Sequence, residues 1–201
     1  AIAAFFMLCL AANAQNTWTQ KTNFGGQERR YSFAFSITSA QGTLGYIGAG
    51  EAPYFQDFWV YDPAVDSWTQ KANYAGLGRI GVFSFTIGAK GYAGNGYDNN
   101  TTVPYNDFWE YNPVTNLWTQ KANMPIARSY GAGFSIIGKG YVATGDVTGQ
   151  FTQTIDDLWE YDPIIDTWTQ KTSIPVTGYG RYCAVAFSIG SKGYFFIGIP
   201  L

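Results

Sequence analysis

The sequence predicts an all-β repeat fold, and two observations carry this prediction. The tetrapeptide Trp-Thr-Gln-Lys occurs four times, and each copy begins 50 residues after the one before it, at Trp18, Trp68, Trp118 and Trp168. A strict period of this length indicates one structural unit stacked on copies of itself. Within each unit, short apolar runs alternate with turn residues. No stretch long enough to form a helix has the 3.6-residue apolar period of one.

The first two strands of each unit are expected to form a hairpin. The first strand carries Phe-Ser-Ile or Phe-Thr-Ile, and we predict it at residues 33–37, 82–87, 133–137 and 184–189. The second strand begins with Gly-Tyr, at Gly45, Gly91, Gly140 and Gly193. The residues between them, such as Gly88-Ala89-Lys90, are few and turn-forming, which suits a hairpin.

The third and fourth strands follow after a longer connection. The third is predicted at residues 57–61, 107–111 and 157–161, each closed by an Asp-Pro or Asn-Pro turn. The Trp-Thr-Gln-Lys segment is the fourth, outer strand. Four strands in a unit of about 50 residues match the strand number and length of a β-propeller blade.

At this level the residues resemble the kelch family. The kelch pattern has an Arg before the inner strand, a Gly-rich second strand, a Tyr-Asp-Pro turn and an outer-strand Trp. All of these features are present in this sequence. The departure is the double Gly that ends the second strand, which reads Gly48-Ala49-Gly50, Gly94-Asn95-Gly96 and Thr144-Gly145. The resemblance implies a propeller of kelch-type blades and covers nearly all of residues 15–201.

The chain is expected to divide into a leader and an incomplete propeller. Residues 1–14 form an apolar run ending in Ala12-Asn13-Ala14, which is typical of a secretory signal peptide clipped at its front, with a short anchor as the alternative. The predicted propeller elements are an outer strand at 17–21, blades at 29–71, 79–121 and 128–171, and a partial blade at 181–201. Kelch propellers often close through an N-terminal strand, and the segment at 17–21 fits that closure. Three and a half blades would leave strand edges exposed and the last sheet incomplete, so we expect a fragment of a propeller of six or seven blades.

Composition excludes several classes of function for these residues. The net charge of −2 gives no basis for binding nucleic acid or an anionic membrane, and the leader is too short to span a bilayer. The chain has no His, so the copper site of galactose oxidase-like kelch relatives, a zinc site and a Ser-His-Asp triad cannot be built from it. We therefore expect no metal, no cofactor and no catalytic residue here.

Two sets of repeated residues allow a structural and a functional interpretation. The seven Trp residues are wedges between blades or platforms for sugars, and their recurrence favours wedges: Trp18, Trp59, Trp68, Trp109, Trp118, Trp159 and Trp168. Four Arg residues precede the inner strands at one offset, and they either tie loops together or form a ring that grips anions: Arg29, Arg79, Arg128 and Arg181. The recurring Asp57, Asp107 and Asp157 indicate turn capping rather than acid–base chemistry.

The loops between the second and third strands are the other candidate binding elements. They span residues 51–56, 97–106 and 146–156 and differ in length and content. Their aromatic side chains, with the four Arg residues, form the candidate ligand-binding set: Tyr54, Tyr97, Tyr105 and Phe151. Ordinary solvated loops are the alternative.

These observations predict a secreted or cell-surface propeller that binds a protein or glycan at its loop face without catalysis, and that is monomeric once the ring is complete. One alternative is the scaffold portion of an exported galactose oxidase-like or sialidase-like enzyme whose catalytic residues lie elsewhere. Another is a structural spacer of a cell-surface protein. The loop face and the ends of the blade series are therefore the regions to examine in the structure.

Overall fold

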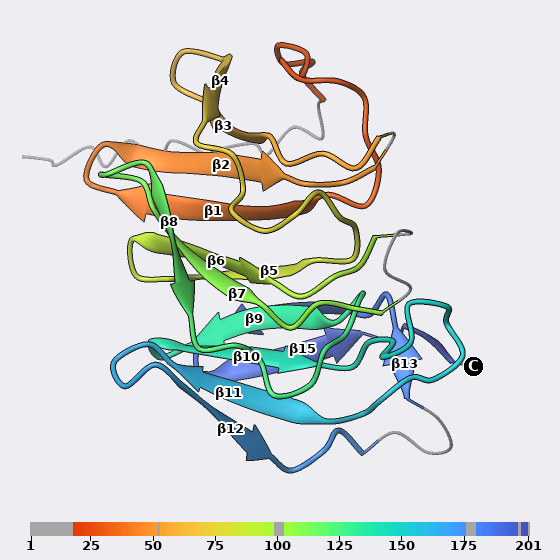
Figure 1. Cartoon of the computed structure of the whole chain (residues 1–201). Helices are drawn as coiled ribbons and strands as arrows, with labels where there is room; N and C mark the ends of the chain where they lie inside the picture. The colour runs from red at the N-terminus through yellow and green to blue at the C-terminus, as the bar shows by residue number, and fades with distance from the viewer. Residues whose placement is uncertain (1–17, 52, 99–102, 176–179, 197, 201) are drawn as a thin grey trace, which may run out of the picture.

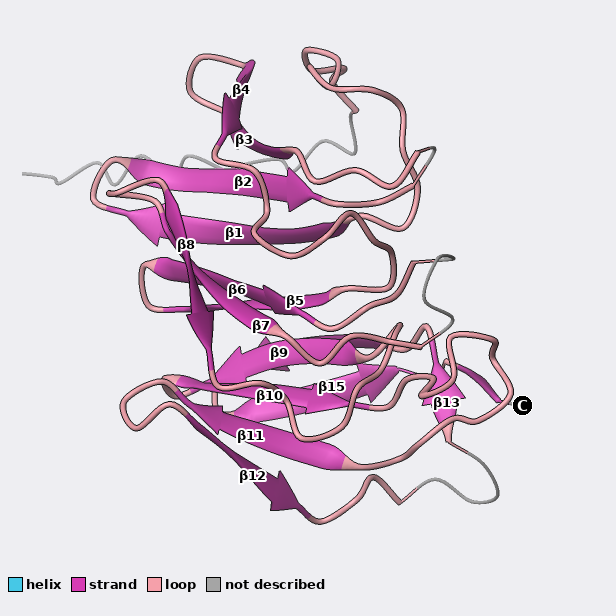
Figure 2. Ribbon diagram, in the orientation of Figure 1, coloured by secondary structure: helices cyan, strands magenta, loops and turns pink. Residues whose placement is uncertain are grey.

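The computed structural model describes residues 18–51, 53–98, 103–175, 180–196 and 198–200, and these residues form strands and no helix. These residues contain no helix that is long and apolar enough to cross a membrane. Three four-stranded antiparallel sheets follow one another along the molecule, with a smaller fourth unit behind the third (Figures 1 and 2). The all-β prediction of four-stranded blades is confirmed.

Each sheet runs in simple chain order from its first to its fourth strand. Blade 1 contains β1 (Phe33–Ser39), β2 (Gly42–Gly48), β3 (Phe58–Asp62) and β4 (Ser67–Lys71). Blade 2 contains β5 (Phe83–Ile87), β6 (Lys90–Gly94), β7 (Phe108–Asn112) and β8 (Leu117–Lys121). Blade 3 contains β9 (Ala132–Ile136), β10 (Lys139–Ala143), β11 (Leu158–Asp162) and β12 (Thr167–Lys171).

The last unit, called the half-blade below, is a hairpin with a short second pair of strands beside it. The hairpin is β14 (Val185–Ile189) and β15 (Lys192–Phe196), and the short pair is β13 (Arg181–Tyr182) with β16 (Ile199–Pro200). At the other end of the chain, Trp18–Lys21 is not a strand, although we predicted an outer strand at 17–21; Thr17 lies outside the described residues. An outer strand needs a third strand beside it, and no described residue supplies one there.

The apolar core lies between the blades rather than inside them. One cluster joins Phe33, Tyr46 and Phe58 of blade 1 to Ala93 and Tyr111 of blade 2. A second cluster repeats this arrangement between blades 2 and 3, with the following main members: Phe83, Phe85, Tyr92, Phe108, Met124, Val142 and Tyr161. A sheet face is therefore buried where a neighbouring blade covers it.

Two of the outer-strand tryptophans, Trp118 and Trp168, lie at the junctions between neighbouring blades. The Trp118 ring on β8 of blade 2 lies against Phe33, Phe58 and Tyr74 of blade 1, with ring centroids 5.0–6.3 Å apart. Its Nε1 donates a hydrogen bond to the Ala72 carbonyl at 3.3 Å, while the Ala72 amide donates to Asn116 Oδ1 at 3.0 Å. Residue 72 is therefore held on both sides by the next blade, as the wedge interpretation of the tryptophans requires.

Candidate functional site

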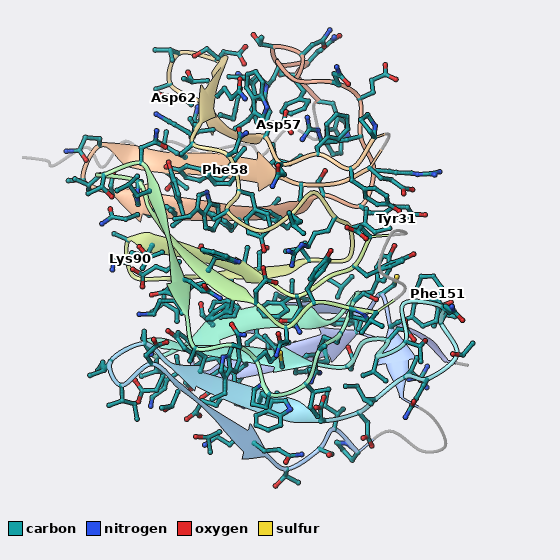
Figure 3. All side chains as sticks on the ribbon, viewed as in Figure 1. Tyr31, Asp57, Phe58, Asp62, Lys90 and Phe151 are labelled. Atoms are coloured by element: carbon teal, nitrogen blue, oxygen red, sulfur yellow. The ribbon has the colours of Figure 1, made fainter. Side chains whose placement is uncertain are left out.

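The two faces of the propeller differ in what they carry. One face bears the hairpin turns between first and second strands, where Lys90 lies; the other bears the connections from second to third strands, where Tyr31 and Phe151 lie (Figure 3). We call the second one the loop face. Loops displayed by rigid strands are where binding residues gather in β-propellers and other scaffolds.

The three arginines that precede the full blades are buried beneath the loop face. Arg128 donates from both Nη atoms to the Asp157 carboxylate at 2.6 and 2.8 Å, and also to the Thr144 carbonyl at 2.9 Å. Arg29 binds Asp57 in the same two-bond manner, as Arg79 binds Asp107. These three arginine side chains are at most 3% exposed.

Each carboxylate in these pairs also accepts a third hydrogen bond from the tryptophan two residues later. Trp59, Trp109 and Trp159 donate from Nε1 at 2.7, 2.8 and 2.6 Å. An Arg–Asp–Trp unit thus fixes the start of the first strand to the start of the third within one blade. This geometry favours the structural interpretation of these arginines, because their donors are already bound to groups of the chain.

Arg181, the fourth arginine, sits differently because it precedes the half-blade. It is only partly buried, and its Nη1 donates to the Gly198 carbonyl at 3.2 Å. Its Nε is buried and has no hydrogen-bond partner among the described residues. The sequence offset that it shares with the other three arginines therefore does not give it the same surroundings.

The Arg29–Asp57 pair predicts how stability depends on pH. Burial opposes ionisation of Asp57, but hydrogen bonds from Arg29 and Trp59 together with the guanidinium charge hold its pKa below the ordinary value of 3.8. A lowered folded pKa gives stability that is present above 3.8 and is lost as the pH falls through the folded value. We expect the urea midpoints of the wild type and Asp57→Asn to differ at pH 7 and to converge below pH 3.8. A constant difference would contradict this assignment.

A cluster of aromatic rings lies on the loop face where the chain enters the first strands. Tyr130 is at its centre, with ring centroids 5.8 Å from Tyr31, 6.2 Å from Tyr97 and 5.2 Å from Phe151. Tyr182 extends the cluster from Phe151 at 4.6 Å. These five residues, named the aromatic cluster below, come from blades 1, 2 and 3 and from the half-blade.

Three residues of the aromatic cluster have a left-handed backbone conformation, which repeated loop positions such as Asn95 and Asp166 also adopt. Tyr31, Tyr130 and Phe151 have φ values of 59°, 55° and 57°, in the left-handed region. Tyr31 and Tyr130 occupy the same position of the repeat. That position holds Gly81 in blade 2 and Cys183 in the half-blade, and both of these residues also have positive φ. Bulky residues rarely adopt this conformation, and such strain gathers at binding sites.

A small hollow opens beside these residues. Its volume is about 160 Å³, and its lining includes Tyr31, Gly81, Tyr130 and Cys183. Cys183 is exposed, and partial desolvation raises the pKa of its thiol above the ordinary value. Burial likewise raises the pKa of Tyr97 and Tyr130, which keeps their hydroxyls neutral. The described residues hold no group of three metal-ligating side chains.

Sequence reasoning found part of this site. Tyr97 and Phe151 were predicted and lie in the aromatic cluster, and Tyr54 lies near enough to Tyr97 to influence its pKa. Tyr105 instead stacks on the guanidinium of Arg79 at 3.9 Å and donates to Asp98 at 2.9 Å. Tyr31 and Tyr130 were missed, although both lie two residues after a repeated arginine, and that shared offset was the available signal.

Comparisons with known proteins agree with this architecture. A family model for the Kelch motif matches residues 96–125, which include the third and fourth strands of blade 2. The solved structure of YjhT is similar to the chain with a TM-score of 0.70 and 22% sequence identity, covering 84% of this chain and 58% of the YjhT chain. No curated protein matches the chain. The chain covers less than two thirds of the YjhT structure.

The repeat, the four-stranded blades and the stacked cores define the class as a β-propeller scaffold, which is commonly non-catalytic. Together with the Kelch motif match at residues 96–125, they support a kelch-type β-propeller fold for the chain. Members of this fold serve generally as protein-interaction or scaffold modules. The functional question is therefore what the loop face binds.

Proposed function

We propose that the chain is a non-catalytic binding module that holds a segment of a partner protein on its loop face. The observation that carries this proposal is the aromatic cluster, in which five rings meet beside a hollow and three of the five residues keep left-handed backbone conformations. Each such residue costs on the order of 1–3 kcal/mol and persists where the surroundings hold it. Tyrosines with neutral hydroxyls supply apolar area and hydrogen bonds, as protein-binding surfaces do.

The site of action that we propose is outside the cell. This part of the proposal is supported by the apolar leader that ends in Ala12-Asn13-Ala14, which lies outside the described residues. The buried Arg–Asp–Trp units contribute rigidity to the loop face rather than direct contacts. Partner recognition then depends on rigid display of the rings, without covalent chemistry.

A displayed library of random dodecapeptides, panned on the wild type, tests this function. Tyr31 and Phe151 are replaced together by glycine, which suits a positive φ and which the repeat itself uses at Gly81. Removing central aromatic contacts costs about 2 kcal/mol or more, so selected peptides should bind the double variant at least about 30-fold more weakly. Lys90→Ala on the opposite face is the matched control and should bind normally.

Two results would contradict the proposal. Peptides that bind the double variant as tightly as the wild type would place recognition away from the aromatic cluster. A library that yields no peptide, combined with binding on a glycan array that the double variant loses, would assign the same face to a glycan instead. Circular dichroism and urea unfolding of the double variant are the controls that separate a loss of binding from a loss of fold.

A further inference from the structure

A small polar network recurs between the second and third strands of blades 2 and 3. In blade 2, the Tyr92 hydroxyl donates to Glu110 Oε2 at 2.6 Å, and the Lys90 ammonium pairs with the same carboxylate. Blade 3 repeats both contacts with the following residues: Tyr141, Glu160 and Lys139. In these two blades the tyrosine hydroxyl is therefore paired within its own sheet.

Blade 1 keeps the tyrosine of this network but has neither of its charged residues. In the register of β2 and β3, Val60 lies opposite Tyr46, which is the place of the glutamate in the other two blades. Leu44, two residues before Tyr46, takes the place of the lysine. The Tyr46 hydroxyl consequently has no hydrogen-bond partner among the described residues, although the residue is only 4% exposed. Buried hydroxyls are normally paired, so this one is available to a group from outside the chain.

Tyr46 lines a hollow on the face that bears the hairpin turns, opposite the loop face. The hollow has a volume of about 200 Å³ and lies where blade 1 meets the turn between β7 and β8 of blade 2 (Figure 1). Ile37, Leu44 and Tyr46 line it from blade 1, and Pro113 and Val114 line it from blade 2. Ile37 belongs to the apolar cluster between these blades and is 3% exposed, so the hollow reaches down to the core.

The hairpin of blade 1 also differs from the equivalent hairpins in length. Its strands β1 and β2 have seven residues each, whereas β5, β6, β9 and β10 have five. In the longer hairpin, Ser39 and Gln41 add a polar edge to the hollow, and Ser39 Oγ donates to Gln41 Oε1 at 3.0 Å. The hollow is therefore built by features that are specific to blade 1 and not by the repeat.

We propose that this hollow, called the Tyr46 site below, binds a small uncharged molecule with one aromatic ring and one hydrogen-bonding atom. An apolar cavity of about 150 Å³ holds benzene, so a hollow of about 200 Å³ accommodates a ring with one or two further atoms. Ligand sites of this kind are mostly apolar and contain a few placed polar groups. Here the apolar side chains contact the ring, and the Tyr46 hydroxyl bonds the polar atom.

The electrostatic surroundings select against charged ligands. No side chain that lines the hollow is charged, so an ion would lose its hydration there without gaining a counter-charge. Burial raises the pKa of Tyr46, so its hydroxyl stays neutral and able to donate. The blades with the lysine and glutamate network offer neither condition.

Nuclear magnetic resonance titration of the chain with three probes of similar size tests the proposal. The probes are p-cresol, toluene, which lacks the polar atom, and p-toluate, which is charged. We expect p-cresol to saturate with a Kd of about 1 mM or tighter. Toluene should bind about five-fold more weakly because it lacks the hydrogen bond, and p-toluate should bind most weakly. The amide shifts should gather at residues 37–46 and 113–114.

Two variants assign the binding to the Tyr46 site. Tyr46→Phe should weaken p-cresol about five-fold and leave toluene unchanged, which a merely structural effect would not do. Leu44→Lys combined with Val60→Glu gives blade 1 the network of blades 2 and 3, and should abolish binding of both probes because it occupies the hydroxyl and fills the hollow. Thr119→Val on the exposed part of β8 is the matched control and should bind p-cresol normally.

Three results would overturn the proposal. They are a lack of saturable p-cresol binding up to about 10 mM, amide shifts that lie away from the hollow, and a ratio of p-cresol to toluene affinity that Tyr46→Phe leaves unchanged. Tyr46→Phe removes a single oxygen atom, so it remains informative even if the double variant unfolds. The Tyr46 site and the aromatic cluster lie on opposite faces, and peptide binding tests the loop-face function separately.

Discussion

Replacing Arg128 by alanine is expected to lower the free energy of unfolding by about 3–5 kcal/mol, because the buried Asp157 carboxylate would lose its cation. Arg128 is fully buried and forms four hydrogen bonds, two to Asp157 and one each to the Thr144 and Ile126 carbonyls. The loss therefore includes both the unpaired charge and an unsatisfied backbone acceptor. Urea unfolding at pH 7, followed by tryptophan fluorescence, measures the change.

Two companion variants make this result specific to burial. Arg30 pairs with Glu51 at 2.6 Å, but its side chain is 70% exposed, so Arg30→Ala should cost about 1 kcal/mol or less. Arg128→Met combined with Asp157→Leu removes both charges and should be less destabilising than Arg128→Ala alone. Equal unfolding curves for Arg128→Ala and Arg30→Ala would contradict the structural role of the buried pair.

Replacing Trp118 by alanine is expected to destabilise the chain by about 3–5 kcal/mol, because it opens a cavity between blades 1 and 2. The substitution also removes the Nε1 hydrogen bond to the Ala72 carbonyl. Trp18 occupies the same place in the repeated tetrapeptide but is fully exposed, so Trp18→Ala is a matched control with little effect. Equal unfolding midpoints for the two variants would instead assign Trp118 a surface role.

The strands could be predicted because every blade repeats the same local signals. The alternation around Phe85, the Gly-Tyr at Gly91 and the Asp-Pro or Asn-Pro turns each act over a few residues, and their 50-residue period excludes accidental patterns. The same signal predicted an outer strand at 17–21, and the described residues 18–21 are not a strand. A strand depends on its neighbour as well as on its sequence, and no described residue supplies a third strand beside this segment.

The candidate site was less predictable because its geometry depends on contacts between distant residues. Arg79 and Asp107 both recur with the period, but the sequence does not say that their side chains meet inside the blade. The same limit applies to Tyr31 and Tyr130, which share an offset from a repeated arginine and have positive φ values. The offset does not say that their rings meet across blades, because that contact depends on how the blades pack.

The position of the apolar clusters has a consequence for cooperativity. Since each cluster is shared by two neighbouring blades, none of the described blades contains a complete apolar core of its own. The thermodynamic unit is the junction, and stability accumulates junction by junction as in a one-dimensional array. A cut between two blades would therefore divide an apolar core in half, and blade 2, which contributes residues to both apolar clusters, is the last to open.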